Sequence, residues 1–156
     1  MSVLGRVGSF VDRVGGFFDV PEVARYVTLS PRTFTIPDES SGLPVSDRHF
    51  QDVTAPGLVP GSLPVLFFRT SNGGRSGFSI RVNAVRVIQD TLSGTEPAPL
   101  SWHVLVPPGA LAPEGNELTF AVPAGGSVLF SDVVILYRSN QLTVKKSILE
   151  PPIATQ

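Results

Sequence analysis

The chain has 156 residues and no cysteine, and its 12 Lys and Arg residues against 13 Asp and Glu give a net charge of −1. This length fits one domain with a core of its own, and the lack of cysteine excludes disulfides, thiolate metal sites and cysteine nucleophiles. The near-neutral charge argues against partners such as nucleic acid or anionic lipid, which need a basic surface. The 15 glycines and 15 prolines, with only 16% charged residues, are typical of short strands joined by turns.

The first twenty residues show a helical pattern that the rest of the chain lacks. Large apolar side chains recur every three or four residues and would share one side of a helix over residues 3–18. They are Val3, Leu4, Val7, Phe10, Val11, Val14, Phe17 and Phe18. Several glycines lower the helix propensity here, so we expect the helix to form only when it is docked on a partner subunit or a membrane surface. We therefore predict an amphipathic docking segment over residues 1–22.

Charged residues also interrupt every apolar run of this segment. Arg6, Asp12 and Arg13 leave neither the continuous core of a secretory signal nor the roughly 18 apolar residues of a transmembrane helix. We therefore expect no secretory signal and no transmembrane segment, and synthesis in the cytoplasm. Localisation beyond that stays open, with association to a particle as one alternative.

Downstream of the docking segment the sequence indicates strands. Residues 26–36 predict one or two short strands, with Pro31 marking an edge position or a break. The stretch 37–64 is rich in Pro, Gly, Ser and Asp, and we interpret it as a long exposed connection with at most one short strand. A connection of this length is a candidate contact surface. Further strands are predicted at 63–70, 77–90, 100–106, 117–122, 128–138 and 142–149.

Two of these strands carry additional information about their faces. Residues 63–70 form an apolar run typical of a strand buried on both faces, in which Phe67 and Phe68 point to opposite sides. Within 77–90 the apolar positions change from even to odd numbers at Asn83–Ala84. This change of phase indicates a bulge or a tight turn, because a regular strand keeps one parity.

Asp132 interrupts the most apolar of the predicted strands, 128–138. A regular strand would place its carboxylate among apolar neighbours, at a cost of several kcal/mol unless it were hydrogen-bonded. A bulge at Ser131–Asp132 avoids this cost and leaves Asp132 at the surface or the sheet end. We favour the bulge because the core positions would then be β-branched or aromatic, namely Phe130, Val133, Ile135 and Tyr137.

Short strands about ten residues apart, separated by Gly and Pro turns, are typical of antiparallel sandwiches and barrels. We predict an all-β fold, an antiparallel β-sandwich of seven to nine strands over residues 23–149. A short amphipathic helical segment over residues 1–22 precedes this domain, and a loose C-terminal tail over 150–156 follows it.

The segments FSIRVNAVRV, VLVPPGAL, PEGNELTFAV and GGSVLFSDVVILYR follow one another in this order between Gly77 and Arg138. This stretch resembles the galactose-binding-domain-like jelly-roll sandwiches, a group that includes many carbohydrate-binding modules. In that group a hairpin carries Asn at its turn, as Asn83 would here, and the closing strand often carries an acidic residue, as at Asp132. A segment between them matches at Val106, Pro107, Leu111, Gly115, Asn116, Leu118, Phe120 and Val122. The resemblance implies a jelly-roll topology and a glycan as candidate ligand, although no sugar-binding residue maps onto this chain.

No set of residues in the sequence predicts catalysis or metal binding. The two histidines, His49 and His103, cannot build a multi-histidine metal site, and no other metal-ligand spacing occurs. A Ser–His–Asp set could be assembled from Ser101 or Ser131 with His103 and Asp132. The chain has no nucleophile elbow to support that set, so we predict no enzyme, no metal and no cofactor.

Three residues remain as candidates for binding a ligand. Trp102 shares its predicted face with apolar neighbours, which favours a place in the core over a sugar platform. His103 points to the opposite face, where a histidine at the surface or rim is the ordinary outcome. Asp132 is a candidate for a ligand or cation contact, against the more ordinary role of a hydrogen-bonded bulge residue.

The absence of reactive residues and the apolar docking segment together favour a structural role. We predict a non-catalytic β-sandwich component of a larger assembly, such as a virion, a tail-like particle or an oligomeric shell, that docks through its N-terminal segment. An exposed stripe of eight apolar side chains would be a liability on a monomer, so we expect a protein partner or self-association. The alternative function is a carbohydrate-binding module that recognises a glycan at the sandwich loops.

Overall fold

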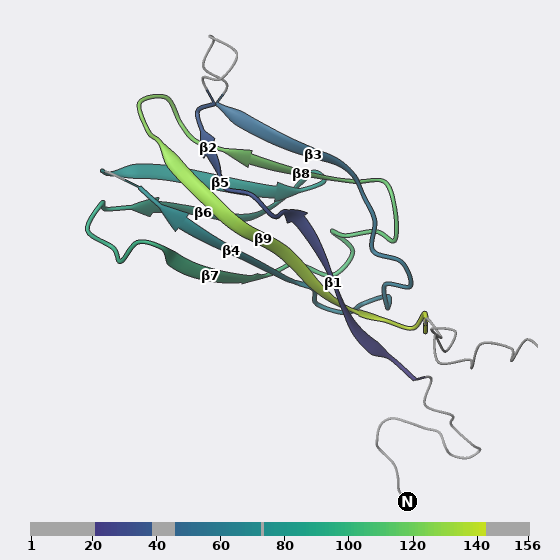
Figure 1. The fold of residues 1–156 in the computed structure, drawn as a ribbon. Coiled ribbons are helices and arrows are strands. Elements are labelled where there is room, and N and C mark those ends of the chain that lie inside the picture. The colour runs from purple at the N-terminus through teal and green to yellow at the C-terminus, as the bar shows by residue number, and fades with distance from the viewer. Residues whose placement is uncertain (1–20, 39–45, 73, 143–156) are drawn as a thin grey trace, which may run out of the picture.

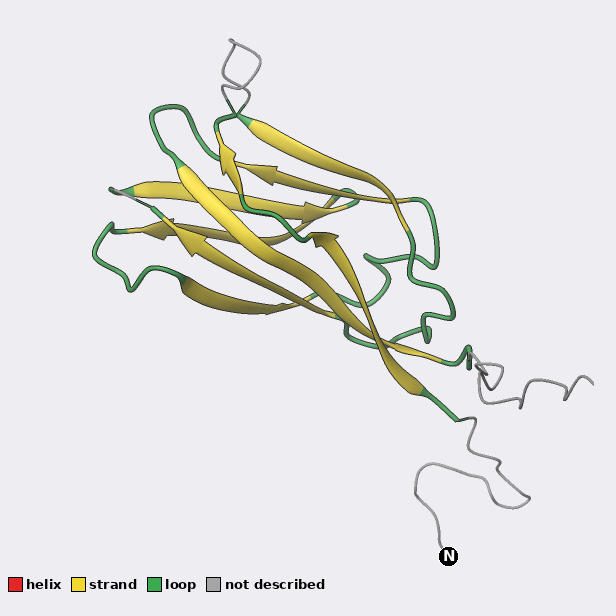
Figure 2. Ribbon diagram, in the orientation of Figure 1, coloured by secondary structure: helices red, strands yellow, loops and turns green. Residues whose placement is uncertain are grey.

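The computed structural model describes residues 21–38, 46–72 and 74–142 (Figure 1). These residues form strands joined by loops and turns, with no helix among them (Figure 2). The predicted helix over 3–18 and the tail over 150–156 lie outside the described residues. So does the predicted strand over 142–149, apart from Leu142.

Nine strands build the domain, and all of their pairings are antiparallel. A five-stranded sheet has the order β1-β9-β4-β7, with β2 also paired to β9, and a four-stranded sheet has the order β3-β8-β5-β6. The strands are β1 (Val23–Ser30), β2 (Phe34–Ile36), β3 (Asp47–Val53), β4 (Val65–Ser71), β5 (Ser76–Val82), β6 (Val85–Leu92), β7 (Leu100–Leu105), β8 (Asn116–Ala121) and β9 (Val128–Ser139). The two sheets lie face to face as the layers of the predicted β-sandwich (Figure 1).

Aromatic rings fill the space between the sheets. Phe120 and Phe130 face each other edge to face across the two layers, with ring centroids 5.2 Å apart, and Phe78 meets Phe130 at 5.8 Å. Burying each such ring stabilises the fold by about 1.5–3 kcal/mol. The largest fully buried side chains are Phe68, Phe78, Phe120, Phe130, Ile36, Leu66, Ile80, Leu92, Leu118, Ile135 and Val82. Phe78, Ile80 and Val82 of the predicted strand 77–90 and Leu118 and Phe120 of 117–122 are among them, whereas Val85 is 38% exposed.

The predicted changes of phase are confirmed. Asn83 and Ala84 form the tight turn between β5 and β6, and Asn83 takes the positive φ of 56° that such turns require. Asp132 has a φ of 52°, and the pairing of β4 with β9 shifts by one residue beside it. Phe130 and Val133 are therefore both buried while Asp132 is exposed, as the bulge predicts.

Two predictions about the strands need correction. The connection 37–64 contains a full strand, β3, which pairs with β8; its sequence is polar because only Phe50 and Val53 of this edge strand pack against the core. β4 is not buried on both faces, since Phe67 is 40% exposed while Phe68 is 2% exposed. β4 has a neighbouring strand on each side in its sheet. Its outer side is exposed because no element of the described part covers it.

The rest of this connection, residues 54–64, is also packed rather than loose. Tyr137 and Ser139 of β9 both donate hydrogen bonds to the carbonyl of Pro56, at 3.2 and 2.8 Å. Burial raises the pKa of the Tyr137 phenol above its usual range. Gly57 has a φ of 73°, and a Cβ there would collide with Ser139, so only glycine fits this close approach.

A buried amide network fixes the same end of the sandwich. Asn116, at the start of β8, is completely buried, and its amide nitrogen donates to the carbonyls of Val53 and Ala112 at 2.8 and 2.7 Å. Its amide oxygen accepts from the backbone N–H of Ala112 and from the side chain of Asn83, at 2.8 and 3.0 Å. Asn83 also donates to the carbonyl of Ala110 and accepts the N–H of Glu117. One side chain thus joins β3, the turn between β5 and β6, and the connection between β7 and β8.

The bulge predicts a specific pattern of stabilities at Asp132. Asp132→Asn should change the free energy of unfolding by less than about 1 kcal/mol, because Asn tolerates positive φ and the carboxylate is exposed. Asp132→Val should cost about 1–3 kcal/mol, since a β-branched residue is strained there. Ile135→Ala should cost about 2–5 kcal/mol as a core truncation. Urea denaturation measures all three, and a larger loss from Asp132→Asn than from Ile135→Ala would contradict the bulge.

The amide network predicts a large loss of stability from a nearly isosteric change. Asn116→Asp should lower the free energy of unfolding by about 3–5 kcal/mol, because an oxygen would replace the nitrogen that donates to two buried carbonyls. Asn140→Asp, at an exposed position, is the matched control and should change stability by less than about 0.5 kcal/mol. Equal losses in the two variants, measured by thermal and urea unfolding, would show that the network contributes little.

Candidate functional site

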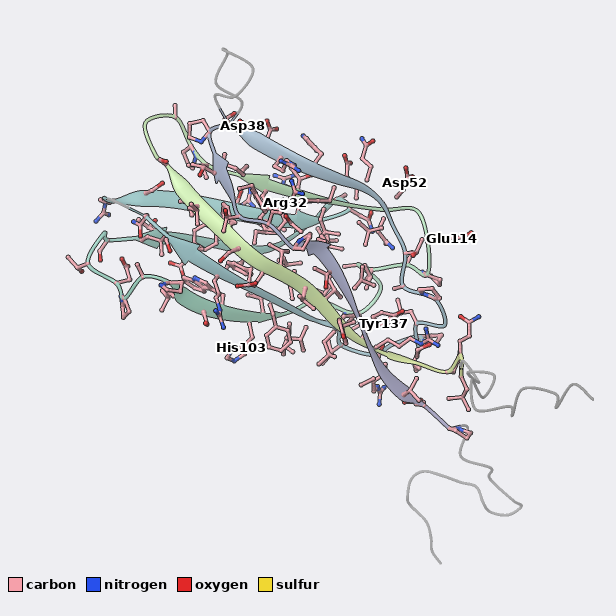
Figure 3. All side chains as sticks on the ribbon, viewed as in Figure 1. Arg32, Asp38, Asp52, His103, Glu114 and Tyr137 are labelled. Atoms are coloured by element: carbon pink, nitrogen blue, oxygen red, sulfur yellow. The ribbon has the colours of Figure 1, made fainter. Side chains whose placement is uncertain are left out.

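The structure separates the three residues that the sequence offered as ligand contacts. Trp102 points inward, where its ring stacks on Phe68 with centroids 5.9 Å apart and meets Phe78 edge to face at 5.4 Å. Its indole N–H donates to the hydroxyl of Thr70 at 2.9 Å, so its polar atom is satisfied inside the sandwich. His103, the next residue on β7, projects away from the sandwich into solvent (Figure 3). Trp102 and His103 therefore face opposite sides of the sheet.

His103 and Asp132 do lie on one surface, the outer side of the five-stranded sheet. His103 is the cross-strand partner of Phe67 on β4, and their rings are 6.3 Å apart. Arg69, two residues further along β4, forms an ion pair with Asp132 at 3.6 Å. Both partners of this ion pair are more than half exposed, so the pair contributes little to stability. Together these residues make the polar end of the surface.

Next to this polar end the surface is apolar. The strand registers align Tyr26, Leu136, Val65 and Leu105 in one row across β1, β9, β4 and β7. The adjacent row contains Thr28, Val134, Phe67 and His103. We call the six apolar members of these two rows the apolar face: Tyr26, Val65, Phe67, Leu105, Val134 and Leu136. Tyr26, Leu105 and Phe67 are 70%, 60% and 40% exposed.

The outer side of the other sheet has the opposite character. Its registers align polar residues, and His49 on β3 lies between the carboxylates of Asp47 at 3.3 Å and Glu117 at 3.1 Å. Gln51 and Thr119 add hydrogen bonds to this group. Such a solvated polar side is the ordinary outcome for an antiparallel sheet that packs its other side on the core. The comparison makes the apolar face the exceptional surface of the domain.

The hollows of the described surface do not suggest a catalytic site. A groove of about 310 Å³ lies between residues 58–64 and 107–113 and is lined mainly by proline and aliphatic side chains. A second hollow of about 340 Å³ has Thr35, Ser71, Asn72, Ser127 and Leu129 around it. Among the described residues no group of three or more His, Asp or Glu side chains could hold a metal ion. The described residues contain no helix, and therefore no helix that could cross a membrane.

One carboxylate, that of Glu96 in the connection between β6 and β7, has a strongly lowered pKa. Glu96 accepts the backbone N–H groups of Ser93 and Gly94 at 2.7 and 2.8 Å. These bonds, above all the one from Ser93, lower the pKa of Glu96 to about 2. The effect stabilises the turn after β6, and nothing around it suggests chemistry.

Sequence reasoning missed the apolar face as a surface, although the signal for it was present. Residues 63–70 are apolar at both even and odd positions, which led to the prediction of burial on both faces. The structure assigns the even positions, such as Leu66 and Phe68, to the core and leaves Val65 and Phe67 on the outer side. What the sequence did not contain was the pairing of β4 with β9 and β7, which aligns these residues with Leu136 and Leu105.

No protein family matches this sequence, and no curated protein matches it. Solved structures with a similar fold include the following three. The dimeric latent PorU of Porphyromonas gingivalis aligns at a TM-score of 0.46 and 12% identity, over 76% of this chain and 13% of that one. This chain thus spans a small part of PorU.

The other two structures are carbohydrate-binding modules. The C-terminal CBM6 of LamC, a marine laminarinase from Zobellia galactanivorans, has a TM-score of 0.36 and 15% identity, over 68% of this chain and 99% of that one. The module CBM36, solved with calcium and xylotriose, has a TM-score of 0.35 and 13% identity, over 77% of this chain and all of that one. The sandwich itself is established by the strand pairing described above.

The lowered pKa of Glu96 predicts how its turn responds to acid. Because the folded-state pKa is below the ordinary value near 4.3, the carboxylate stabilises the fold above that range, and this contribution is lost as the pH falls toward 2. NMR titration of the Glu96 side chain should give a midpoint near 2. The Glu96→Gln variant should lack the corresponding acid shift in the amide signals of Ser93 and Gly94. A midpoint near 4 would mean that these hydrogen bonds do not persist in solution.

Proposed function

We propose that this chain is a non-catalytic β-sandwich that serves as an interaction component of a larger protein assembly. The observation that carries the proposal is the apolar face, with Tyr26 70% and Leu105 60% exposed. Contiguous apolar surface of this kind is uncommon on a protein that stays monomeric, and it marks sites where another protein binds. The outer side of the other sheet is polar, so an apolar outer side is not a general property of this domain.

The composition of the apolar face favours a protein over a small polar ligand. Four of its six members are the aliphatic side chains Val65, Leu105, Val134 and Leu136, which offer a sugar neither a ring to stack on nor a hydrogen bond. It also lies on regular strands rather than in a concave pocket, which suits a broad contact.

Glycan binding is the second candidate, because of the polar end of the same surface. There the partly exposed ring of Phe67 lies beside His103, and the Arg69–Asp132 ion pair follows in the next row. An exposed ring flanked by charged and hydrogen-bonding groups is an arrangement that can hold a sugar. The resemblance to carbohydrate-binding modules supports the same candidate, and two structures with a similar fold are such modules.

Charge substitutions test the proposal. Tyr26→Arg and Leu105→Arg should weaken self-association of the full chain at least about tenfold, measured by sedimentation velocity over a range of concentrations. Thr91→Arg, at an exposed position of β6 in the other sheet, is the control and should leave association unchanged. All three variants should unfold at nearly the same urea concentration as the unmodified chain, because both target side chains are mostly exposed.

A glycan array distinguishes the two candidates. A chain that stays monomeric at every concentration, and that binds a glycan which Phe67→Ala and Arg69→Ala abolish, would contradict the assembly role and establish the second. Association that depends on Leu105, with no glycan bound, would support the first.

A further inference from the structure

We propose that the apolar face is covered by the N-terminal docking segment, residues 3–18, of a second copy of this chain. This inference rests on the proposed function and names the partner. Residues 3–18 lie outside the described residues, so the inference rests on their sequence and on the place where the chain enters β1.

The two middle strands of the five-stranded sheet carry apolar side chains on both of their faces. In β4, Leu66 and Phe68 point into the core while Val65 and Phe67 point outward. In β9, Ile135 is likewise buried while Val134 and Leu136 face outward. Strands that are apolar on both sides are typical of sheets covered by a layer on each face. The four-stranded sheet covers one face, and the other face therefore lacks its second layer.

The docking segment, in turn, needs an apolar surface in order to form its helix. Its eight large apolar side chains share one side of the predicted helix, but Gly5, Gly8, Gly15 and Gly16 make that helix too weak to form alone. An apolar surface outside the segment would supply the missing stabilisation. Among the described residues the apolar face offers such a surface, with three large side chains at least 40% exposed on strands of one sheet.

The predicted helix is also long enough to cross the whole apolar face. A helix of 16 residues is about 24 Å long. The two rows of the apolar face cross four strands, whose three spacings amount to about 14 Å. Two copies that exchange segments would bury six phenylalanines, which remove about 900–1,500 Å² from water before the aliphatic side chains are counted. Specific interfaces bury areas of this size.

The geometry at the start of β1 directs the segment to a second copy rather than to its own sheet. Val23–Arg25 pair with residues 137–139 of β9, whereas the pairing of β4 with β9 ends at Leu136. The start of β1 therefore lies beyond the ends of β4 and β7 (Figure 1). Glu22, the residue before β1, forms an ion pair with Arg138 of β9 at 3.6 Å. To cover its own face, the segment would have to reverse direction within residues 19–21, and a neighbouring copy needs no such reversal.

Cysteine cross-linking tests the inference directly, because the native chain has no cysteine. Full-length Val11→Cys and Leu105→Cys are purified separately, mixed, and treated with a short bifunctional maleimide. Each variant carries one thiol, so a product that joins residue 11 to residue 105 must come from two copies. We expect this mixed product to exceed, at least about tenfold, the product of Val11→Cys mixed with Thr91→Cys, whose thiol lies on the other sheet. Peptide mass spectrometry identifies the joined residues.

Two further variants, a double cysteine variant and a deletion of residues 3–18, make every outcome decisive. A double variant, Val11→Cys with Leu105→Cys, should give cross-linked dimers; an internally cross-linked monomer would show that the segment covers its own sheet and would overturn the inference. Loss of the mixed product together with self-association that still depends on Leu105 would leave the proposed function standing and remove the docking segment as the occupant. Self-association that depends on neither Leu105 nor residues 3–18 would overturn both proposals.

Discussion

The hydrogen bonds of Asn116 are the constraint on which one whole end of the sandwich depends. All four hydrogen-bonding positions of this buried amide are used, and the partners come from β3, from the connection after β7 and from the turn at Asn83. These segments are distant in sequence, and one of them, the connection between β7 and β8, crosses between the two sheets. An aliphatic side chain of the same size could fill the space, but it would leave buried carbonyl and N–H groups without partners. The polar network therefore specifies the arrangement of the connections, while the aromatic core supplies most of the stability.

The two outer surfaces of the sandwich differ in the polarity of their side chains. The four-stranded sheet alternates apolar inside and polar outside, and its side chains pair with one another, as His49 does with Asp47 and Glu117. The five-stranded sheet breaks this alternation in its two middle strands, β9 and β4, where the outward positions are also apolar. Leaving Tyr26 and Leu105 in water contributes nothing to the fold of the monomer. The function of the domain is therefore to be sought on this face and in whatever covers it.

The sequence was sufficient to predict the fold class, most strands and both irregularities. The change of parity at Asn83–Ala84 and the acidic residue at 132 each have a single local explanation, a turn and a bulge, so periodicity could locate them. β3 was allowed for as one short strand within 37–64 but could not be located, because an edge strand with two core-facing residues has almost no periodic signal. The apolar face could not be predicted because it depends on which strands are neighbours, and alternation within one strand says nothing about that. His103 and Asp132 were named from the sequence, but only the register shows that Phe67 and Arg69 lie between them.

The glycine content of the docking segment determines what kind of assembly the proposed exchange would produce. Ordering a flexible chain costs about 1–2 kcal/mol per residue, and glycine loses the most freedom. Fixing 16 residues with four glycines therefore consumes much of the free energy that burial of the apolar stripe supplies. The resulting contact would bury as much area as a stable interface but bind more weakly. Assembly would therefore depend on protein concentration. An alanine in place of each glycine would favour the helix by about 1 kcal/mol per position and so strengthen the contact. In the exchange that we propose, the glycines would favour copies that fold as separate sandwiches and associate reversibly afterwards.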